Sequence, residues 1–124
     1  MNKKKLLLVD DERDFINTMA ERLAFRGFDP VVAYTGQDAL ALCQNETFDC
    51  VILDLRMPEM DGIEVLGRLR ELFPTLRVII LTGHGHNKER EECMRLGAFE
   101  YRNKPVEMGV LLEILNAATC GPNI

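Results

Sequence analysis

Short apolar runs that alternate with longer segments of helical period are the feature that most constrains the fold of this chain. The runs lie at residues 6–9, 31–33, 51–55 and 78–81, with a weaker one at 99–101. Continuous runs of this length, several of them rich in Val and Ile, favour strands buried on both faces. Between the runs, apolar residues recur at the three- and four-residue spacing of amphipathic helices, in the segments 15–23, 39–43, 63–73 and 108–118.

Residues typical of helix ends fall between these segments. Gly27 and Gly97 stand where a glycine commonly ends a helix. Thr35 and Asn87 are candidate N-caps, and Asp61 with Glu64 predicts a capping box. A fifth helix is expected over residues 87–96, but it is mostly charged. A helix with so few apolar residues is either peripheral or an element that moves.

Five strands alternating with helices predict an α/β fold, in which a parallel sheet carries helices on both faces. Right-handed crossovers leave few topologies. The pattern does not fix the strand order, and we expect 2-1-3-4-5, the flavodoxin-like doubly wound arrangement. A length of 124 residues fits one domain. We assign this domain to residues 1–119 and expect 120–124 to form a frayed tail.

Charge and hydropathy exclude several classes of function. Asp and Glu number 20 against 15 Lys and Arg, and no basic block exceeds Lys3-Lys4-Lys5. Nucleic-acid binding by this chain is therefore not expected, since it requires cations facing phosphates. The apolar run at 6–9 is too short for a secretory leader, and no stretch approaches the roughly 18 apolar residues of a membrane span. We expect a soluble cytoplasmic protein.

The four cysteines, Cys43, Cys50, Cys93 and Cys120, form no Cys-x-x-Cys pair and have no histidine at a zinc spacing. We expect reduced thiols that mostly pack as small apolar groups.

Charged and polar residues follow the expected strands at their carboxyl ends, where open parallel sheets form their sites. Asp10 and Asp11 follow the first strand, Asp54 the third, Thr82 the fourth and Lys104 the fifth. In the expected order these side chains converge on one edge. An all-oxygen site with few ligands favours Mg²⁺, which recruits phosphate oxygens. A carboxylate there can act as the nucleophile and form an aspartyl phosphate.

The chain resembles the receiver domain of bacterial two-component response regulators over nearly its whole length. The motifs that carry the resemblance are Leu8-Val9-Asp10-Asp11-Glu12, the segment from Leu53-Asp54-Leu55-Arg56 through Met57-Pro58 to Asp61-Gly62, Leu81-Thr82-Gly83, and Lys104-Pro105. The loop Gly83-His84-Gly85-His86 is similar to the Thr-Gly-His-Gly form of regulators of enhancer-dependent transcription.

The resemblance implies the roles of the site residues. Asp54 would accept a phosphoryl group from a sensor histidine kinase or phosphotransfer protein. Asp10, Asp11, Asp54 and the backbone carbonyl of Arg56 would hold Mg²⁺. Lys104 would pair with the phosphoryl group, and the Lys104-Pro105 bond would be cis, as is usual in the family.

The resemblance also implies a conformational switch. Thr82 would bind the phosphoryl oxygens and move inward on phosphorylation. Tyr101, three residues before Lys104, stands where the family keeps its switch aromatic. The face formed by the fourth helix, fifth strand and fifth helix would then signal to an output domain or partner protein. The identity of the kinase and the oligomeric state, including a dimer that depends on phosphorylation, stay open.

Two other functions fit parts of the pattern. A haloacid-dehalogenase-like phosphatase would also use Asp54 as nucleophile, but its Asp-x-Asp motif requires an aspartate where this chain has Arg56. A flavin-binding module needs a phosphate-cradling loop after the first strand, where Asp10-Asp11-Glu12 would repel a phosphate. We therefore expect a signalling domain that catalyses only its own phosphorylation and dephosphorylation.

Overall fold

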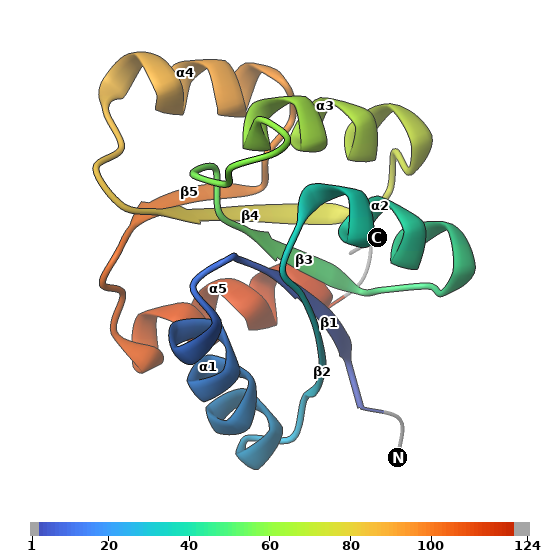
Figure 1. The fold of residues 1–124 in the computed structure, drawn as a ribbon. Helices are drawn as coiled ribbons and strands as arrows, with labels where there is room; N and C mark the ends of the chain where they lie inside the picture. Colours follow the sequence, from blue (N-terminus) through green and yellow to red (C-terminus); the bar gives the residue numbers. More distant parts are fainter. Residues whose placement is uncertain (1–2, 121–124) are drawn as a thin grey trace.

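The computed structural model describes residues 3–120 and contains five strands that alternate with five helices (Figure 1). The strands are β1 (Lys5–Val9), β2 (Asp29–Ala33), β3 (Cys50–Leu53), β4 (Arg77–Thr82) and β5 (Glu100–Asn103). The helices are α1 (Arg13–Phe25), α2 (Gly36–Asn45), α3 (Gly62–Leu72), α4 (Asn87–Arg95) and α5 (Met108–Thr119). Every strand and helix predicted from the sequence is present.

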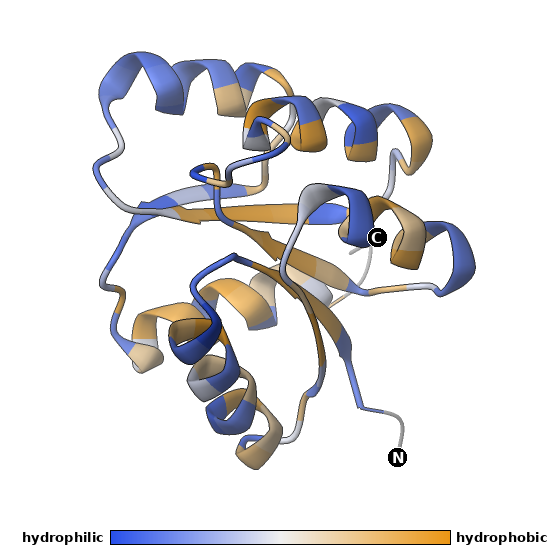
Figure 2. Ribbon diagram, in the orientation of Figure 1, coloured by the Kyte–Doolittle hydropathy of each residue, from blue (hydrophilic) through white to orange (hydrophobic). Residues whose placement is uncertain are grey.

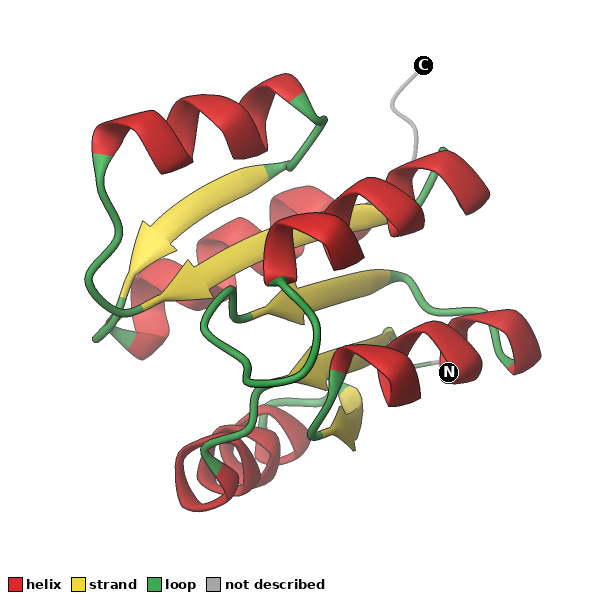
Figure 3. Ribbon diagram, turned by 45° about the horizontal axis from the view of Figure 1, so that its top comes forward, coloured by secondary structure: helices red, strands yellow, loops and turns green. Residues whose placement is uncertain are grey.

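The strands form one parallel sheet in the order β2-β1-β3-β4-β5, which confirms the predicted flavodoxin-like topology. Helices α1 and α5 cover one face of the sheet, and α2, α3 and α4 cover the other (Figures 1 and 3). Because β1 and β3 are neighbours while the chain winds outward from them in both directions, the switch point lies between these two strands.

The core consists of two apolar layers, one on each side of the sheet. In β1, Leu7 and Val9 pack into the layer under α2 and α3, whereas Leu6 and Leu8 pack against α1 and α5. Successive side chains of a strand point to opposite faces, so a strand covered on both sides must be apolar at every position. Figure 2 shows the central strands of the sheet, β1, β3 and β4, coloured mainly as hydrophobic.

The helix ends follow the predicted signals with two exceptions. The side chain of Thr35 accepts from the backbone N–H of Asp38, and Gly27 and Gly97 have positive φ angles of 94° and 103°. Asn87 is not an N-cap, because the imidazole of the preceding residue, His86, accepts from the Glu89 backbone N–H instead. Asp61 caps α3 through the N–H of Ile63, two residues on, with no reciprocal bond from Glu64 among the described contacts.

Three of the four cysteines pack as predicted. Cys43, Cys50 and Cys93 are buried, and burial raises the pKa of their thiols to about 11, 12 and 11. These thiols therefore stay protonated and apolar near neutral pH. Cys120 differs because its side chain is exposed. The rest of the predicted tail, residues 121–124, lies outside the described residues. No helix within 3–120 combines the length and apolar character that a bilayer crossing demands.

Helix α4 is the least apolar of the five, as Figure 2 shows. Only Glu89 and Cys93 on it are buried, while Met94 and the adjoining Leu96 are more than a third exposed. The helix therefore contributes little apolar burial, and polar contacts must do more to hold it in place.

We predict opposite effects of adding a methyl group at two glycines of α3. A Cβ at Gly62 would collide with the Leu55 Cα and lie 2.9 Å from the Leu55 carbonyl oxygen and 3.0 Å from that of Asp54. Gly62→Ala should lower the free energy of unfolding by about 1–3 kcal/mol, as other overpacked sites do.

A Cβ at Gly67 meets nothing within 4 Å, so Gly67→Ala should raise the free energy of unfolding by about 0.5–1 kcal/mol through helix propensity. Urea titrations of the two variants and the wild type measure both effects. A Gly62→Ala variant as stable as the wild type would refute the close approach of α3 to the backbone after β3.

Candidate functional site

Backbone hydrogen bonds extend the sheet one residue past its strands and set the site residues side by side. The N–H of Asp10 donates to the Ala33 carbonyl at 3.1 Å, and the N–H of Asp54 donates to the Val9 carbonyl at 2.9 Å. The N–H of Lys104 donates to the Thr82 carbonyl at 2.8 Å. Asp10, Asp54, Thr82 and Lys104 therefore lie at the same edge of the sheet, as the sequence predicted.

Lys104, which follows β5, contacts the carboxylates that follow β1 and β3 at this edge. Its ammonium donates to Asp10 Oδ2 at 2.7 Å and to Glu12 Oε1 at 2.7 Å, and it lies 3.8 Å from Asp54 Oδ2. It also lies 4.4 Å from the centre of the Phe15 ring. Burial lowers the pKa of Lys104, but the bonds to Asp10 and Glu12 outweigh burial and raise it, so the ammonium stays charged.

Asp54 is the buried carboxylate whose bonding is incomplete. Its side chain is only 3% exposed, and among residues 3–120 no group donates a hydrogen bond to its Oδ1 atom. Burial raises the pKa of Asp54, and the charge of Asp10 raises it further, against the opposing effect of Lys104. Because a buried acceptor without a partner is costly, Asp54 Oδ1 is poised to receive a cation or an electrophile.

The oxygen atoms at this edge fit a hard divalent cation. One carboxylate oxygen each from Asp10, Glu12 and Asp54 lie within 4.8 Å of one another. Three carboxylates face a single ammonium, and their donor set contains no sulfur or imidazole, which suits Mg²⁺. Asp11 is exposed and, with Arg56, lines the same hollow as Asp54, but it does not belong to this group of three.

The loop after β4 runs past this hollow. Thr82 is fully buried, and its hydroxyl donates weakly to the Gly83 carbonyl at 3.5 Å. His84 has a φ angle of 56°, in the left-handed region that residues other than glycine adopt at a cost. The Lys104-Pro105 bond is cis, as expected.

Tyr101 is buried and turned toward α4. Its hydroxyl donates to Glu89 Oε1 at 2.6 Å, and a side chain at Gly85 would collide with that hydroxyl. Arg56 donates to the same carboxylate, at 2.5 Å to Oε2 and 3.3 Å to Oε1. Burial raises the pKa of Glu89, but the bonds from Arg56 and Tyr101 outweigh burial and lower it, so the carboxylate stays ionised.

Two residues of the site were not identified from the sequence. Glu12 ends the first motif, where the family resemblance implies no role for it, yet its carboxylate accepts a hydrogen bond from Lys104. Glu89 lies on the mostly charged helix, where charge favours a solvated side chain, yet it is only 7% exposed. The spacing offers a signal: Glu89 precedes the apolar Cys93 by four residues and therefore shares its helix face.

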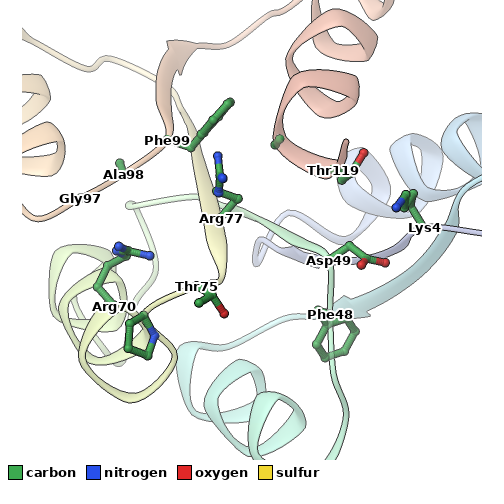
Figure 4. A pocket seen from close by; sticks show the side chains of 12 residues that line it. Lys4, Phe48, Asp49, Arg70, Thr75, Arg77, Gly97, Ala98, Phe99 and Thr119 are labelled. Atoms are coloured by element: carbon green, nitrogen blue, oxygen red, sulfur yellow. The ribbon is translucent and has the colours of Figure 1, made fainter. Parts of the chain in front are cut away.

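A second hollow lies at the opposite end of the sheet, at the amino ends of the strands (Figure 4). Its volume of about 680 Å³ exceeds the 630 Å³ of the hollow beside Asp54. Arg70, Arg77 and Lys4 line it, together with Asp49. Arg77 stacks 5.1 Å from the centre of the Phe99 ring, and Arg70 donates to the Leu76 carbonyl. Two of the three clustered carboxylates, Glu12 and Asp54, line the smaller hollow.

Comparison with known proteins identifies one family. The model described as "Response regulator receiver domain" matches residues 6–116. The transcriptional regulatory protein GlrR of Escherichia coli K12 is 35% identical over 113 residues, which are 91% of this chain and 26% of GlrR. The first curated relatives are likewise matched over about a quarter of their length.

Solved structures agree in fold. A CheY-like receiver domain protein of Methanospirillum hungatei has a TM-score of 0.92 at 29% identity, covering 96% of this chain and 95% of that one. A response regulator of Burkholderia pseudomallei, solved with a phosphorylated aspartic acid, a calcium ion and citrate, has a TM-score of 0.86 at 30% identity. That match covers 94% of this chain and 69% of the Burkholderia chain.

We predict that Asp54→Asn stabilises the protein in the absence of divalent cations. The substitution removes a buried charge whose Oδ1 lacks a partner, so the free energy of unfolding at pH 7 should rise by about 1–3 kcal/mol. Because folding raises the pKa of Asp54 above its ordinary value of 3.8, the ionised carboxylate destabilises the folded state. This destabilisation fades as the pH falls through the raised pKa toward 3.8, since the group is then protonated in the folded protein.

Thermal unfolding of both proteins in EDTA, at pH 7 and near pH 4, measures the difference. The gain from Asp54→Asn should shrink at the lower pH. Glu59→Gln, which neutralises an exposed carboxylate on the same loop, is the control and should change little. A destabilised Asp54→Asn variant would contradict the prediction.

Proposed function

Because the chain belongs to the response regulator receiver domain family of two-component systems, we propose that Asp54 is its phosphoacceptor. The observation that carries this proposal is the buried Asp54 carboxylate, which has an unpartnered Oδ1 and lies 3.8 Å from the Lys104 ammonium. The Burkholderia relative with a phosphorylated aspartate supports the same chemistry.

The proposed reaction is a phosphoryl transfer from a phosphohistidine. A carboxylate oxygen of Asp54 forms a bond to phosphorus as the bond from phosphorus to the histidine nitrogen breaks, and the imidazole leaves with the electron pair of that bond. Hydrolysis later returns Asp54 and inorganic phosphate. Burial and the charge of Asp10 raise the pKa of Asp54, whereas Lys104 opposes that shift and favours the ionised form that attacks.

Mg²⁺ is the cation that the donor set fits, with Asp10, Asp11, Asp54 and the backbone carbonyl of Arg56 as its proposed ligands. Bound there, it would neutralise part of the charge that develops on the phosphoryl oxygens. Glu12 belongs to the observed carboxylate group and is an additional candidate ligand. The calcium ion in the Burkholderia structure supports an oxygen-lined cation site in the family.

Lys104 and Thr82 are the proposed partners of the phosphoryl group. Lys104 would exchange its bond to Glu12, an exposed side chain, for a phosphoryl oxygen while it keeps Asp10. The Thr82 hydroxyl donates only weakly to the Gly83 carbonyl, and it faces Asp54 closely enough to lower the pKa of that carboxyl group, so it is placed to bind a phosphoryl oxygen. Such charge-assisted bonds form in a water-poor site and are correspondingly strong.

Phosphorylation is proposed to act as a switch. Movement of Thr82 would pull the 83–86 loop, which touches β5 where the Gly85 N–H donates to Asn103 Oδ1 at 2.9 Å. Tyr101 and α4 lie directly against this loop. The change is a shift between two populated states that a local charge favours.

A sensor histidine kinase or phosphotransfer protein is the proposed donor, and an output domain or partner protein is the proposed target. Relatives named as transcriptional regulators, of which this chain spans about a quarter, support an output in transcription. The phosphatase alternative lacks its second acid, because Arg56 stands at that position and its guanidinium is bound to Glu89 and the His84 carbonyl.

We predict that acetyl phosphate with Mg²⁺ adds one phosphoryl group to the wild-type chain, measured as intact mass. Asp54→Asn should show no gain, because the nucleophile is lost, and omission of Mg²⁺ should abolish or strongly slow the gain in the wild type. Glu59→Gln is the matched control and should label normally. Binding of beryllofluoride, observed by ¹⁹F NMR, distinguishes a short-lived phosphoryl group from a site that takes none. Labelling of Asp54→Asn equal to the wild type would assign the phosphoacceptor elsewhere.

We also predict that Mg²⁺ stabilises the folded chain through the carboxylate group. At ten times its dissociation constant, a ligand of the folded state alone adds about 1.4 kcal/mol to the free energy of unfolding. Asp10→Asn should reduce this gain, whereas Asp29→Asn, an exposed aspartate at the opposite end of the sheet, should retain it. Melting temperatures in MgCl₂ and in NaCl of equal ionic strength give the comparison. An equal Mg²⁺ effect in both variants would place the cation elsewhere.

A further inference from the structure

The Arg56 side chain is bound by Glu89, a residue of helix α4 that follows it by 33 residues in the chain. Its guanidinium forms a two-pronged contact with Glu89, at 2.5 and 3.3 Å, and donates to the His84 carbonyl at 3.2 Å. The Arg56 side chain is 45% exposed, whereas that of Glu89 is 7% exposed. Glu89 is therefore the fixed partner of the pair, whereas the exposed Arg56 side chain has room to move once its hydrogen bonds break.

Glu89 makes a second contact at the same time. Its Oε1 atom accepts from the Tyr101 hydroxyl at 2.6 Å as well as from Arg56. One buried carboxylate thus holds both the loop after Asp54 and the aromatic side chain of β5. Because a buried carboxylate needs its partners, loss of either one weakens the position of the other.

We propose that Glu89 is a positioning residue that keeps Arg56 from the Asp54 phosphoryl group, and that phosphorylation draws Arg56 from Glu89 to the phosphoryl oxygens. The proposal rests on the proposed function of Asp54 as phosphoacceptor. In this proposal the contact between Glu89 and Arg56 slows phosphorylation. When phosphorylation breaks that contact, the change is passed to Tyr101 through its hydrogen bond to Glu89.

Geometry and charge support the exchange. Arg56, His84 and Asp54 line the same hollow, which joins the Arg56 side chain to the proposed phosphorylation site. A phosphoryl group adds charge there and offers oxygens that a guanidinium binds in a two-pronged geometry, as it now binds Glu89.

The exchange has a consequence at the start of α4. With Arg56 gone, Glu89 keeps only the Tyr101 hydroxyl for a buried charge. An incompletely paired buried carboxylate is destabilising, so Glu89 gains by turning toward water. Since α4 buries only Glu89 and Cys93, little apolar contact opposes that movement.

A double-mutant cycle tests the restraint. Glu89→Gln keeps the shape of the side chain and an acceptor for Tyr101, but removes the charge that competes for Arg56. The rate constant of labelling by acetyl phosphate with Mg²⁺ should rise about fivefold, the lower end of typical coupling between sites. In an Arg56→Ala background the same substitution should have no effect, because the residue that Glu89 restrains is absent.

Glu92→Gln is the matched control, because it removes the same charge from an exposed position of α4 and should leave the rate unchanged. Equal effects of Glu89→Gln with and without Arg56, or no effect in either background, would overturn the proposal. Failure of the wild type to be labelled would instead refute the phosphoacceptor assignment, so the two failures are distinguishable.

A second readout follows Tyr101 itself. The chain has no tryptophan and two tyrosines, so Tyr34→Phe leaves Tyr101 as its single emitter. Arg56→Ala in this background should raise the acrylamide quenching constant of Tyr101 in the unphosphorylated protein, and beryllofluoride with Mg²⁺ should do the same when Arg56 is present. Arg90→Ala, which removes an exposed guanidinium from α4, is the control. A quenching constant unaffected by Arg56→Ala would show that Glu89 does not couple the two residues.

Discussion

The contact of the Lys104 ammonium with Asp10 and Asp54 is the interaction on which the site depends. The parallel sheet places carboxylates after β1 and β3, which are adjacent strands, and so forces like charges together in a buried place. Repulsion of this kind would be relieved by protonation or by separation of the strands. Lys104, which follows the last strand, opposes both, and the site is complete only when β5 has joined the sheet.

Lys104 offsets the charge of these carboxylates only in part. Both oxygens of Asp10 have partners, from Lys104 and from the Glu12 backbone N–H, whereas Asp54 Oδ1 has none within residues 3–120. The chain therefore retains one destabilised oxygen at the place where its chemistry is proposed to occur. Binding a cation or forming a bond to phosphorus would relieve that free-energy cost. The unpartnered oxygen therefore favours the cation-bound or phosphorylated protein over the free one.

The sequence predicted what periodicity and strand-end chemistry can encode. The alternation of strands and helices and the placement of helices on both faces of the sheet follow from rules that act along the chain. The pattern did not fix the strand order, but with the expected order 2-1-3-4-5 the convergence of Asp10, Asp54, Thr82 and Lys104 follows as well. The positions of Glu89 and Arg56 do not, because their pairing depends on how α4 is rotated over a loop 33 residues earlier. A charged residue on a charged helix predicts solvent exposure, and only tertiary packing shows that this carboxylate is buried.

The polar character of α4 is explained by that pairing. A helix that buries a broad apolar stripe is fixed by a non-directional force and resists small displacements. Helix α4 instead buries one apolar side chain, Cys93, and its first turn is held by the His86 cap and by the bonds that Glu89 accepts from Arg56 and Tyr101. Hydrogen bonds and ion pairs are directional and can be exchanged for equivalent partners, so a new charge at Asp54 can compete for them in a way that it cannot compete for buried leucines.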